Sequence, residues 1–323
     1  MLSIVIPVFN EQDTLDELHR QIDEAARQHG YEIELVFVDD GSADASWQKI
    51  DSLSRLDPRV RGLRFRRNFG KAAALDAGFK AAQGELVMTM DGDLQDDPRE
   101  IPKFLAKIQG GADVVSGWKQ VRHDPWHKVL PSRVFNWLVS WMTDVRLHDH
   151  NCGLKCYRRA IFEEVRLYGE LHRFIPVLAA ARGWKVEEVV VTHRPREFGQ
   201  SKYGWMRIPK GFLDLLTVKF LTGYGLRPQH LLGSAGLAMF LGGLVGIVIL
   251  TFYWLLSRIL VNWEPVHLHE RAIFFYSLGA LLLGAQFMLT GFLAELVTAM
   301  NMRDRQPYSI AEQTARSTNR MES

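Results

Sequence analysis

The sequence contains few cysteines and no large excess of charge of either sign. Only two of its 323 residues are cysteine, which excludes a small secreted protein built on disulfides. Lys and Arg together number 39 and Asp and Glu number 37, so the formal net charge is +2. This balance argues against an acidic disordered chain. It also gives no reason to expect a nucleic acid as the main partner.

Two stretches toward the end of the sequence lack charged residues altogether. Residues 231–257 and residues 272–294 contain no Asp, Glu, Lys or Arg. A helix needs about 20 consecutive apolar residues to cross a bilayer, and both stretches exceed that length. Soluble helices of this length normally keep a charged face, so membrane spans are favoured over a pair of buried core helices. Gly242 and Gly246 have the spacing of a helix-packing motif.

The first residues lack the basic segment with which a secretory signal begins. We therefore expect the N-terminal part to stay in the cytoplasm. Basic residues precede the first span and follow the second, which slightly favours both ends inside, although Arg258 and Arg271 lie in the connection. Residues 205–224 mix apolar and aromatic side chains with lysines. That pattern is typical of helices lying at a membrane surface, and an ordinary amphipathic helix fits almost as well.

The part before the spans alternates short apolar runs with helical periodicity. This alternation predicts an α/β fold with a Rossmann-like, mostly parallel sheet and helices on both faces. Ligands bind such sheets at the carboxyl ends of the strands. The predicted strands are residues 2–8, 33–38, 60–65, 85–90 and 113–117, and the predicted helices are residues 13–29, 46–56, 71–82 and 98–108.

Polar residues cluster at these strand ends, and the densest cluster follows the fourth strand. The other clusters are Asn10-Glu11, Asp39-Asp40 and Asn68. Asp91 and Asp93 are two residues apart across a glycine, so their carboxylates repel each other unless a cation lies between them. Oxygen ligands favour Mg²⁺ or Mn²⁺, with substrate phosphates completing the coordination shell.

Several other motifs are incomplete or absent. An EF-hand is disfavoured because Asp96 stands where that loop requires glycine, and Asp96 and Asp97 fit helix capping instead. A P-loop ending at Lys71 fails for lack of its first glycine and its Ser or Thr. Lys71 either meets a phosphate near a helix N-terminus or is a surface lysine. Cys152 and Cys156 are better read as free thiols than as zinc ligands. No Gly-x-Ser-x-Gly motif indicates a serine hydrolase.

Taken together, five motifs resemble the inverting family 2 glycosyltransferases with a GT-A fold. Within that group the sequence is similar to polyprenyl-phosphate glycosyltransferases of the dolichyl-phosphate mannose synthase and GtrB-like branch. The resemblance covers residues 1 to about 300. The segments that carry it are residues 4–11, 38–42, 67–71, 91–98 and 193–204. The fourth of these begins with Asp-Gly-Asp-Leu-Gln.

The resemblance implies a role for each matching residue. Metal and diphosphate binding fall to Asp91, Asp93 and Gln95, with Mg²⁺ or Mn²⁺ as the cofactor. The donor is expected near Pro7, Asn10, Glu11, Asp39, Asp40 and Lys71. The acceptor phosphate is expected near Arg122, Lys128, Ser132, Arg194, Arg196, Ser201 and Lys202. Among the acceptor residues, Arg194 and Lys202 are expected to act in catalysis together with the two aspartates. The family often has Arg where Lys128 falls.

The implied reaction transfers one sugar from a nucleotide-diphosphate sugar, UDP-linked rather than GDP-linked, to polyprenyl phosphate such as undecaprenyl phosphate. The Gln-x-x-Arg-Trp motif of processive synthases is absent. The resemblance implies a multi-pass protein of the inner membrane, serving cell-envelope glycans or lipid modification, and leaves room for a homo-oligomer. The expected layout is a cytoplasmic GT-A domain (1–204), interface helices (205–230), a two-helix transmembrane domain (231–299) and a cytoplasmic tail (300–323).

Two other functions stay open at the level of sequence. A diacylglycerol or other hydroxyl acceptor would need a carboxylate base, for which Glu187, Glu188 and Asp149 are candidates. A phosphate acceptor is already anionic near neutral pH and needs no obligatory base. The chain is alternatively a non-catalytic nucleotide-sugar-binding partner of a lipid flippase. The identity of the sugar is not readable from these motifs.

Overall fold

A computed structural model describes residues 1–120, 126–165, 167, 169–192, 194, 207–224, 227–260 and 267–301, with the backbone alone for 126–130, 207–210 and 301. The described chain divides into two compact units, one ending at Val218 and the other beginning at Lys219.

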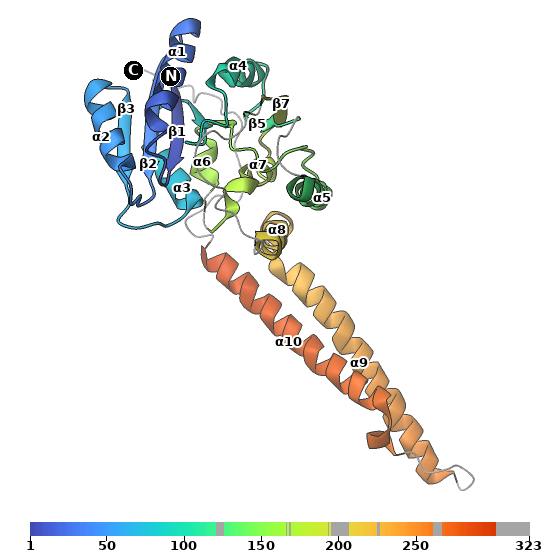
Figure 1. Cartoon of the computed structure of the whole chain (residues 1–323). Coiled ribbons are helices and arrows are strands. Elements are labelled where there is room, and N and C mark those ends of the chain that lie inside the picture. The colour runs from blue at the N-terminus through green and yellow to red at the C-terminus, as the bar shows by residue number, and fades with distance from the viewer. Residues whose placement is uncertain are drawn as a thin grey trace, which may run out of the picture. The chain divides into compact units, whose positions relative to one another are not determined.

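A seven-stranded mixed sheet forms the centre of the first unit (Figure 1). The strand order is β3-β2-β1-β4-β6-β5-β7. Strand β6 runs antiparallel to both neighbours, and every other pair of neighbouring strands is parallel. The expected mostly parallel α/β sheet is therefore confirmed. The strands are β1 (Leu2–Val8), β2 (Ile33–Asp39), β3 (Val60–Arg64), β4 (Leu86–Thr89), β5 (Val114–Trp118), β6 (Lys155–Arg158) and β7 (Val186–Val190).

Helices cover both faces of this sheet, as the alternation of elements predicts. One face packs against α1 (Leu15–His29), α2 (Ser46–Leu56) and α4 (Ile101–Gln109), which follows the turn η1 (Pro98–Glu100). The other face packs against α3 (Lys71–Ala81), α6 (Ile161–Glu164) and α7 (Ile175–Ala180), which follows η2 (Leu171–Phe174).

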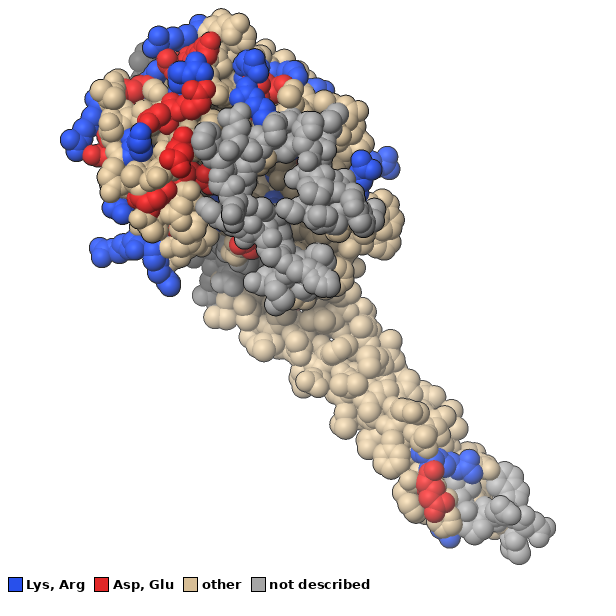
Figure 2. Space-filling view, viewed as in Figure 1, with Lys and Arg blue, Asp and Glu red and all other residues tan. Residues whose placement is uncertain are grey.

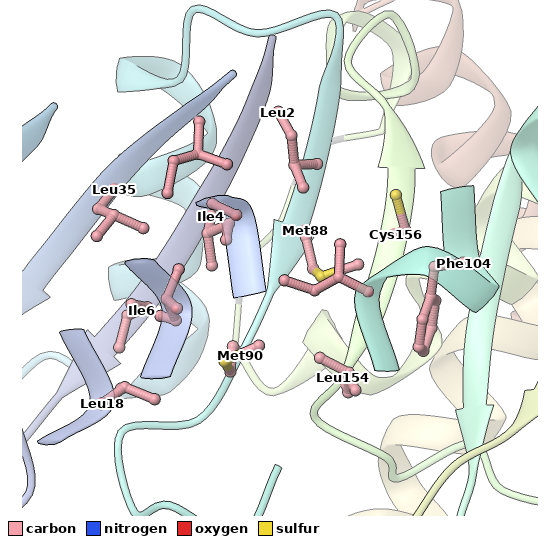
Figure 3. Packing of buried hydrophobic residues seen from close by; sticks show 14 of the residues in the cluster. Leu2, Ile4, Ile6, Leu18, Leu35, Met88, Met90, Phe104, Leu154 and Cys156 are labelled. Carbon is pink, nitrogen blue, oxygen red and sulfur yellow. The ribbon is translucent and has the colours of Figure 1, made fainter. Parts of the chain in front are cut away.

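Strand β1 shows why the sheet is buried on both sides. Its Ile4 and Ile6 point into the α1 side, where Figure 3 shows them among Leu35, Met88 and Leu18, whereas Val5 points to the α3 side. Successive side chains of a strand face opposite ways, so a strand covered on both faces appears in the sequence as an uninterrupted apolar run.

A third hydrophobic cluster joins two further helices to the first unit. Helix α5 (Trp126–Thr143) lies between β5 and β6 in the sequence, and α8 (Arg207–Gly223) follows β7. Val139 of α5 packs with Leu215 and Val218 of α8 and with Phe174 of η2. The sequence pattern beyond residue 117 predicted neither α5 nor strands β6 and β7. Lys155 occupies a buried place in β6, and a charged residue hides the apolar run that would mark a strand.

The second unit is a pair of long apolar helices. Helices α9 (Pro228–Ile259) and α10 (Ala272–Asn301) are joined through η3 (Leu268–Glu270). Mean hydropathy reaches 2.3 in α9 and 1.8 in α10, and only 17% and 11% of their most apolar windows are buried. Figure 2 shows the visible face of this pair without acidic or basic residues over most of its length. The expected pair of spanning helices is confirmed in length and composition, and such exposed apolar surface indicates a membrane protein.

Glycines bring the backbones of α9 and α10 together. A Cβ at Gly243 would lie 2.5 Å from the Ser277 carbonyl oxygen, and one at Gly236 would lie 2.7 Å from the Gly284 carbonyl oxygen. Gly246 contacts the Ser277 hydroxyl, so its predicted packing role is confirmed. A Cβ at Gly242 would meet nothing within 4 Å, so that half of the predicted motif is wrong.

We expect Gly243→Leu to destabilise the helix pair and Gly242→Leu to leave it intact. The first side chain is forced into the α10 backbone, and overpacking of this kind costs about 1–3 kcal/mol or more. The difference is measured by heating the purified full chain in detergent and recording the loss of its monodisperse peak in size-exclusion chromatography. Equal melting of both variants would show that close backbone contact does not hold the pair.

Candidate active site

The loop after β1 is tied to the loop after β2 by Asn10 and Glu11. Asn10 has a φ of 55°, a left-handed conformation that Asn tolerates better than most residues. Its backbone N–H donates to Ser42 Oγ at 2.9 Å, and its side-chain oxygen accepts from the Ala43 N–H at 2.9 Å. The Glu11 N–H donates to Ser46 Oγ at 2.9 Å. These two predicted donor-binding residues therefore lie side by side at the carboxyl edge of the sheet.

Pro7 lies at the same edge. It pairs with Val38 in β2, whereas the pairing of β1 with β4 ends at Val5. A proline is accommodated here because its missing N–H leaves no gap in the β1–β4 ladder.

The two aspartates after β2 are engaged by backbone groups. Asp39 is fully buried and accepts a hydrogen bond from the Ser42 N–H at 2.9 Å. Asp40 accepts from the N–H groups of Phe69 and Gly70 at 2.7 and 2.9 Å, and burial raises the pKa of its carboxyl. Asp40 thus fixes the loop that leads into Lys71.

Glycine is required between these two loops. Gly41 has a φ of +73°, and a Cβ there would lie 2.5 Å from the Arg67 carbonyl carbon. The segments after β2 and β3, which both carry motifs of the predicted nucleotide site, are therefore in direct backbone contact.

The acidic turn after β4 meets Lys71 across this edge. Lys71, the first residue of α3, forms an ion pair with Asp91, and the two side chains are 29% and 32% exposed. Burial alone raises the pKa of the Asp91 carboxyl, but the charge and hydrogen bond of the Lys71 ammonium lower it more, so the net pKa is lowered. Asp91 is accordingly an anion that faces the Lys71 ammonium at this edge of the sheet.

The backbone around Asp91 is packed closely on its other side. The Asp91 N–H donates to the Asp96 carboxylate at 3.3 Å. A Cβ at Gly153, in the segment before β6, would lie 2.5 Å from Asp91 Oδ2. Thr89 Oγ1 donates to the Gly153 carbonyl at 2.7 Å and so holds that segment in place. The Asp91 carboxylate therefore lies between Lys71 and a backbone surface.

Asp93 and Gln95 complete the turn. Asp93 Oδ1 accepts from the Gln95 N–H at 3.2 Å. Between them Leu94 has a φ of 61° and is 6% exposed, so its buried side chain anchors a left-handed turn. Gln95 is joined to Arg194 by a backbone hydrogen bond of 3.2 Å from the Arg194 N–H to the Gln95 carbonyl.

Arg194 reaches the acidic turn, and its guanidinium is already engaged there. One terminal nitrogen pairs with Asp97 Oδ2 at 2.6 Å, and the other donates to Gln21 Oε1 at 2.7 Å. Arg194 is 26% exposed. In this arrangement it joins α1 to the turn, and two of its five N–H donors are used in these contacts.

The structure describes only some of the remaining predicted acceptor residues. Ser132 lies half-buried in α5. Lys128 lies in the same helix, with its side chain outside the described part of the chain. Arg122, Arg196, Ser201 and Lys202 lie outside the described residues.

Sequence reasoning missed a buried basic residue beneath the acidic turn. Lys155 is 4% exposed, and its ammonium donates to the His150 carbonyl oxygen at 3.0 Å. Burial lowers its pKa to about 8. His150 is fully buried, and its ring contacts Ser140 Oγ at 3.1 Å. A lysine inside the short run Leu154-Lys155-Cys156-Tyr157 was the available signal, because such a residue is rarely buried without a reason.

The candidate bases for a hydroxyl acceptor are mostly occupied elsewhere. Glu187 pairs with Lys107 at 2.8 Å, and Glu188 binds the ring and backbone of His148. Asp149 is buried and caps the Asn151 N–H at 3.0 Å.

The donor set fits a hard divalent cation. Asp91 and Asp93 supply carboxylate oxygens and Gln95 an amide oxygen, the ligand types that Mg²⁺ and Mn²⁺ prefer. Within the described ranges no group of three or more His, Cys, Asp or Glu side chains forms a site. A cation at this turn would complete its shell with oxygens of water or of a bound substrate.

This combination defines a class of protein. A mixed α/β sheet with polar loops at the carboxyl ends of β1 and β2, and with an Asp-x-Asp turn after β4, is the GT-A glycosyltransferase architecture. The chain belongs to glycosyl transferase family 2, because the sequence model of that family matches residues 3–166.

Curated relatives match nearly the whole chain. A dodecaprenyl-phosphate galacturonate synthase of Rhizobium johnstonii is 37% identical over 94% of this chain and 89% of its own. An undecaprenyl-phosphate 4-deoxy-4-formamido-L-arabinose transferase of an Enterobacter species is 34% identical over 98% of this chain and 94% of its own. The resemblance to polyprenyl-phosphate glycosyltransferases is thereby confirmed.

A solved structure shows the same fold. Glucosyl-3-phosphoglycerate synthase from Mycobacterium tuberculosis, in complex with Mn²⁺, UDP and phosphoglyceric acid, aligns with a TM-score of 0.54. It covers 69% of this chain and 78% of its own at 15% identity, so the likeness supports the GT-A fold alone.

Proposed function

We propose that this protein transfers a single sugar from a nucleotide-diphosphate sugar, UDP-linked rather than GDP-linked, to a polyprenyl phosphate. The observation that carries the proposal is the Asp91–Lys71 pair at the carboxyl edge of the sheet, in a chain that also contains two helices suited to a bilayer. The relatives act on dodecaprenyl and undecaprenyl phosphate by name, and both are about as long as this chain.

The residues of the site divide between the two halves of the donor. The tied loops of Asn10, Glu11, Asp39 and Asp40, with Pro7 beside them, form the nucleoside side. Asp91, Asp93 and Gln95 form the diphosphate side and hold Mg²⁺ or Mn²⁺. When bound, the cation supplies Lewis acidity toward the leaving diphosphate. Lys71 already faces Asp91, and its ammonium is placed to turn toward the diphosphate when a donor enters.

The transfer step needs no base from the protein. An oxygen of the acceptor phosphate attacks the anomeric carbon as the bond from that carbon to the donor diphosphate breaks, which inverts the centre. The products are polyprenyl-phospho-sugar and nucleoside diphosphate. The chain must hold two anions close together, for which positive charge is required. Arg194 lies at the turn for this purpose, and we assign the same role to Arg122, Lys128, Ser132, Arg196, Ser201 and Lys202.

We place the protein in the inner membrane as a multi-pass protein with the GT-A domain (1–204), the interface helices (205–230) and the tail (300–323) on the cytoplasmic side of the spanning pair (231–299). Nucleotide sugars are made in the cytoplasm, and the basic residues next to both spans favour this orientation.

The decisive assay offers the purified full chain several nucleotide sugars with either undecaprenyl phosphate or diacylglycerol. Mass spectrometry of the extracted lipids should show a polyprenyl-phosphate monosaccharide for at least one donor and no glycosylated diacylglycerol. A product on diacylglycerol alone would replace the proposed acceptor. Tight donor binding without any lipid product would favour a binding partner over an enzyme.

A further inference from the structure

A row of buried polar side chains crosses three neighbouring strands of the sheet. Lys155 of β6 is paired with Thr89 of β4 on one side and with Ser116 of β5 on the other. Their exposed fractions are 4%, 5% and 0%, in that order. Directly paired residues point to the same face of a sheet, so these three side chains lie next to one another. We call them the Thr89-Lys155-Ser116 row.

The neighbouring row on the same face is apolar. Two residues away along each strand it consists of Val87, Tyr157 and Val114, which belong to the core on the α3 side. The face therefore changes from apolar to polar at the end of β4, two residues before Asp91. A polar row that is buried at this edge needs hydrogen-bond partners, because a buried donor without one destabilises the fold.

Each member of the row donates a hydrogen bond to one backbone carbonyl of the segment 149–153, which leads into β6. The three bonds run from Thr89 Oγ1 to Gly153 at 2.7 Å, from Lys155 Nζ to His150 at 3.0 Å and from Ser116 Oγ to Asp149 at 3.5 Å. The segment therefore follows the row across the sheet, with Gly153 at the Thr89 end and Asp149 at the Ser116 end.

The Gly153 end of the segment lies against the acidic turn. A Cβ at Gly153 would lie 2.5 Å from Asp91 Oδ2, so the glycine backbone is already in contact with that carboxylate. On its other side Asp91 pairs with Lys71. A shift of the segment away from the row would therefore change the position of Asp91 Oδ2.

Lys155 is the charged member of the row. Burial lowers the pKa of its ammonium to about 8, and the nearby charges of Asp149 and Asp91 oppose that shift, so the group is a cation at neutral pH. Among the residues that the structure describes, this ammonium forms no ion pair, and its hydrogen bond is to the His150 carbonyl. A methionine would fill the same space without burying a charge. What the ammonium adds is a charge-assisted hydrogen bond to the segment.

We propose that Lys155 and Thr89 are positioning residues for the divalent cation. They hold the segment 149–153 on the sheet, and the Gly153 backbone in turn holds Asp91 Oδ2 in place for the cation. Neither residue touches the cation or the donor, since both act through the segment. Ser116 holds the far end by a longer bond and is not included. This inference rests on the proposed function, in which Asp91 is a ligand of the cation.

The test measures nucleotide binding by the purified full chain in detergent. Lys155→Met and Thr89→Val each remove one hydrogen bond to the segment and keep the approximate shape of the side chain. Ser116→Ala is the matched control, because it removes the bond at the far end of the same row. Calorimetric titration with UDP, with and without Mn²⁺, gives the factor by which Mn²⁺ strengthens binding. Melting temperatures report the stability of each variant.

We expect the Mn²⁺ factor to fall about tenfold in Lys155→Met and in Thr89→Val, the usual size of an effect on a residue that orients a metal ligand. In Ser116→Ala it should change less than about twofold, because that bond is long and distant from Gly153. Binding of UDP without Mn²⁺ should stay nearly constant in all of these variants. The loops after β1 and β2 are held by other hydrogen bonds, which these substitutions leave in place.

An unchanged Mn²⁺ factor in folded Lys155→Met, or in Thr89→Val if Lys155→Met does not fold, would overturn the proposal. So would an equal loss of UDP binding with and without Mn²⁺, since that result means general damage to the site. A loss in Ser116→Ala as large as in the other variants would also overturn it, because stability of the segment alone would then explain the effect. If Mn²⁺ strengthens neither UDP nor GDP binding by the unsubstituted protein, the cation site of the proposed function is itself overturned.

Discussion

Asp93→Asn is expected to reduce sugar transfer by about three orders of magnitude, which corresponds to about 4 kcal/mol of transition-state stabilisation. Asparagine keeps the shape of the side chain, and its oxygen can still accept the hydrogen bond from the Gln95 N–H. The fold of the turn should therefore survive. The substitution removes one negative charge from a donor set that has only two carboxylates, so the divalent cation loses much of its electrostatic hold.

Two measurements separate loss of the cation from loss of the fold. Steady-state transfer with saturating donor gives kcat, and calorimetric titration of UDP with and without Mn²⁺ gives the metal-dependent part of nucleotide binding. Asp93→Asn should abolish that difference while its melting temperature stays near that of the unsubstituted protein. Asp51→Asn is the matched control, because Asp51 is a surface aspartate on α2, with its side chain 44% exposed, and it pairs with Arg55 at 2.8 Å. Full activity of Asp93→Asn in the presence of EDTA would remove the metal from the mechanism.

The parts of the fold that the sequence predicts well are those with a strong local signal. Strands β1 and β2 are interior strands of the sheet and are buried on both faces, so each is a mostly apolar run, broken only by Ser3 and Glu34, and is followed by a polar turn. Helix α1 has a clear stripe of Leu15, Leu18 and Ile22. Because the carboxyl ends of parallel strands share one edge, the polar clusters after these strands were expected to meet, and the structure brings the loops after β1, β2 and β4 together.

The parts that sequence reasoning missed depend on long-range contacts. Strand β6 has four residues and runs antiparallel between β4 and β5, an arrangement that the local sequence does not reveal. Helix α5 contains Pro131 inside it and exposes tryptophans, so its apolar residues do not form a single buried stripe. When a helix carries apolar side chains on both its buried and its exposed sides, its sequence lacks the amphipathic pattern by which helices are recognised.

The site shows the same division between local and distant information. The spacing of Asp91, Asp93 and Gln95 is local, and the sequence identified it. The partners of these residues are distant: Lys71 pairs with Asp91 from the start of α3, and Arg194 pairs with Asp97 across 97 residues of chain. The sequence predicted Arg194 near an acceptor phosphate, but it gave no sign that Asp97 and Gln21 hold its guanidinium.

Gly153→Ala is expected to lower transfer about 100-fold, although Gly153 lies outside every motif that identified the family. Its new methyl group would lie 2.5 Å from Asp91 Oδ2 and 2.8 Å from Asp91 Cγ. The segment cannot move away freely, because its carbonyl accepts a hydrogen bond from Thr89 at 2.7 Å. The Asp91 carboxylate must therefore shift by a large fraction of an ångström, and a displacement of this size in a reacting group costs about 10²-fold in rate.

The matched control lies inside the motif. Gly92, between the two aspartates, has room for a methyl group, since a Cβ there would meet its nearest atom, the Pro7 carbonyl oxygen, at 3.6 Å. Neither glycine has a positive φ, so backbone strain does not distinguish them. Gly92→Ala should retain transfer within about twofold, because 3.6 Å is an ordinary van der Waals distance. Measured kcat values in the reverse order would show that the position of Asp91 against the Gly153 backbone does not control the reaction.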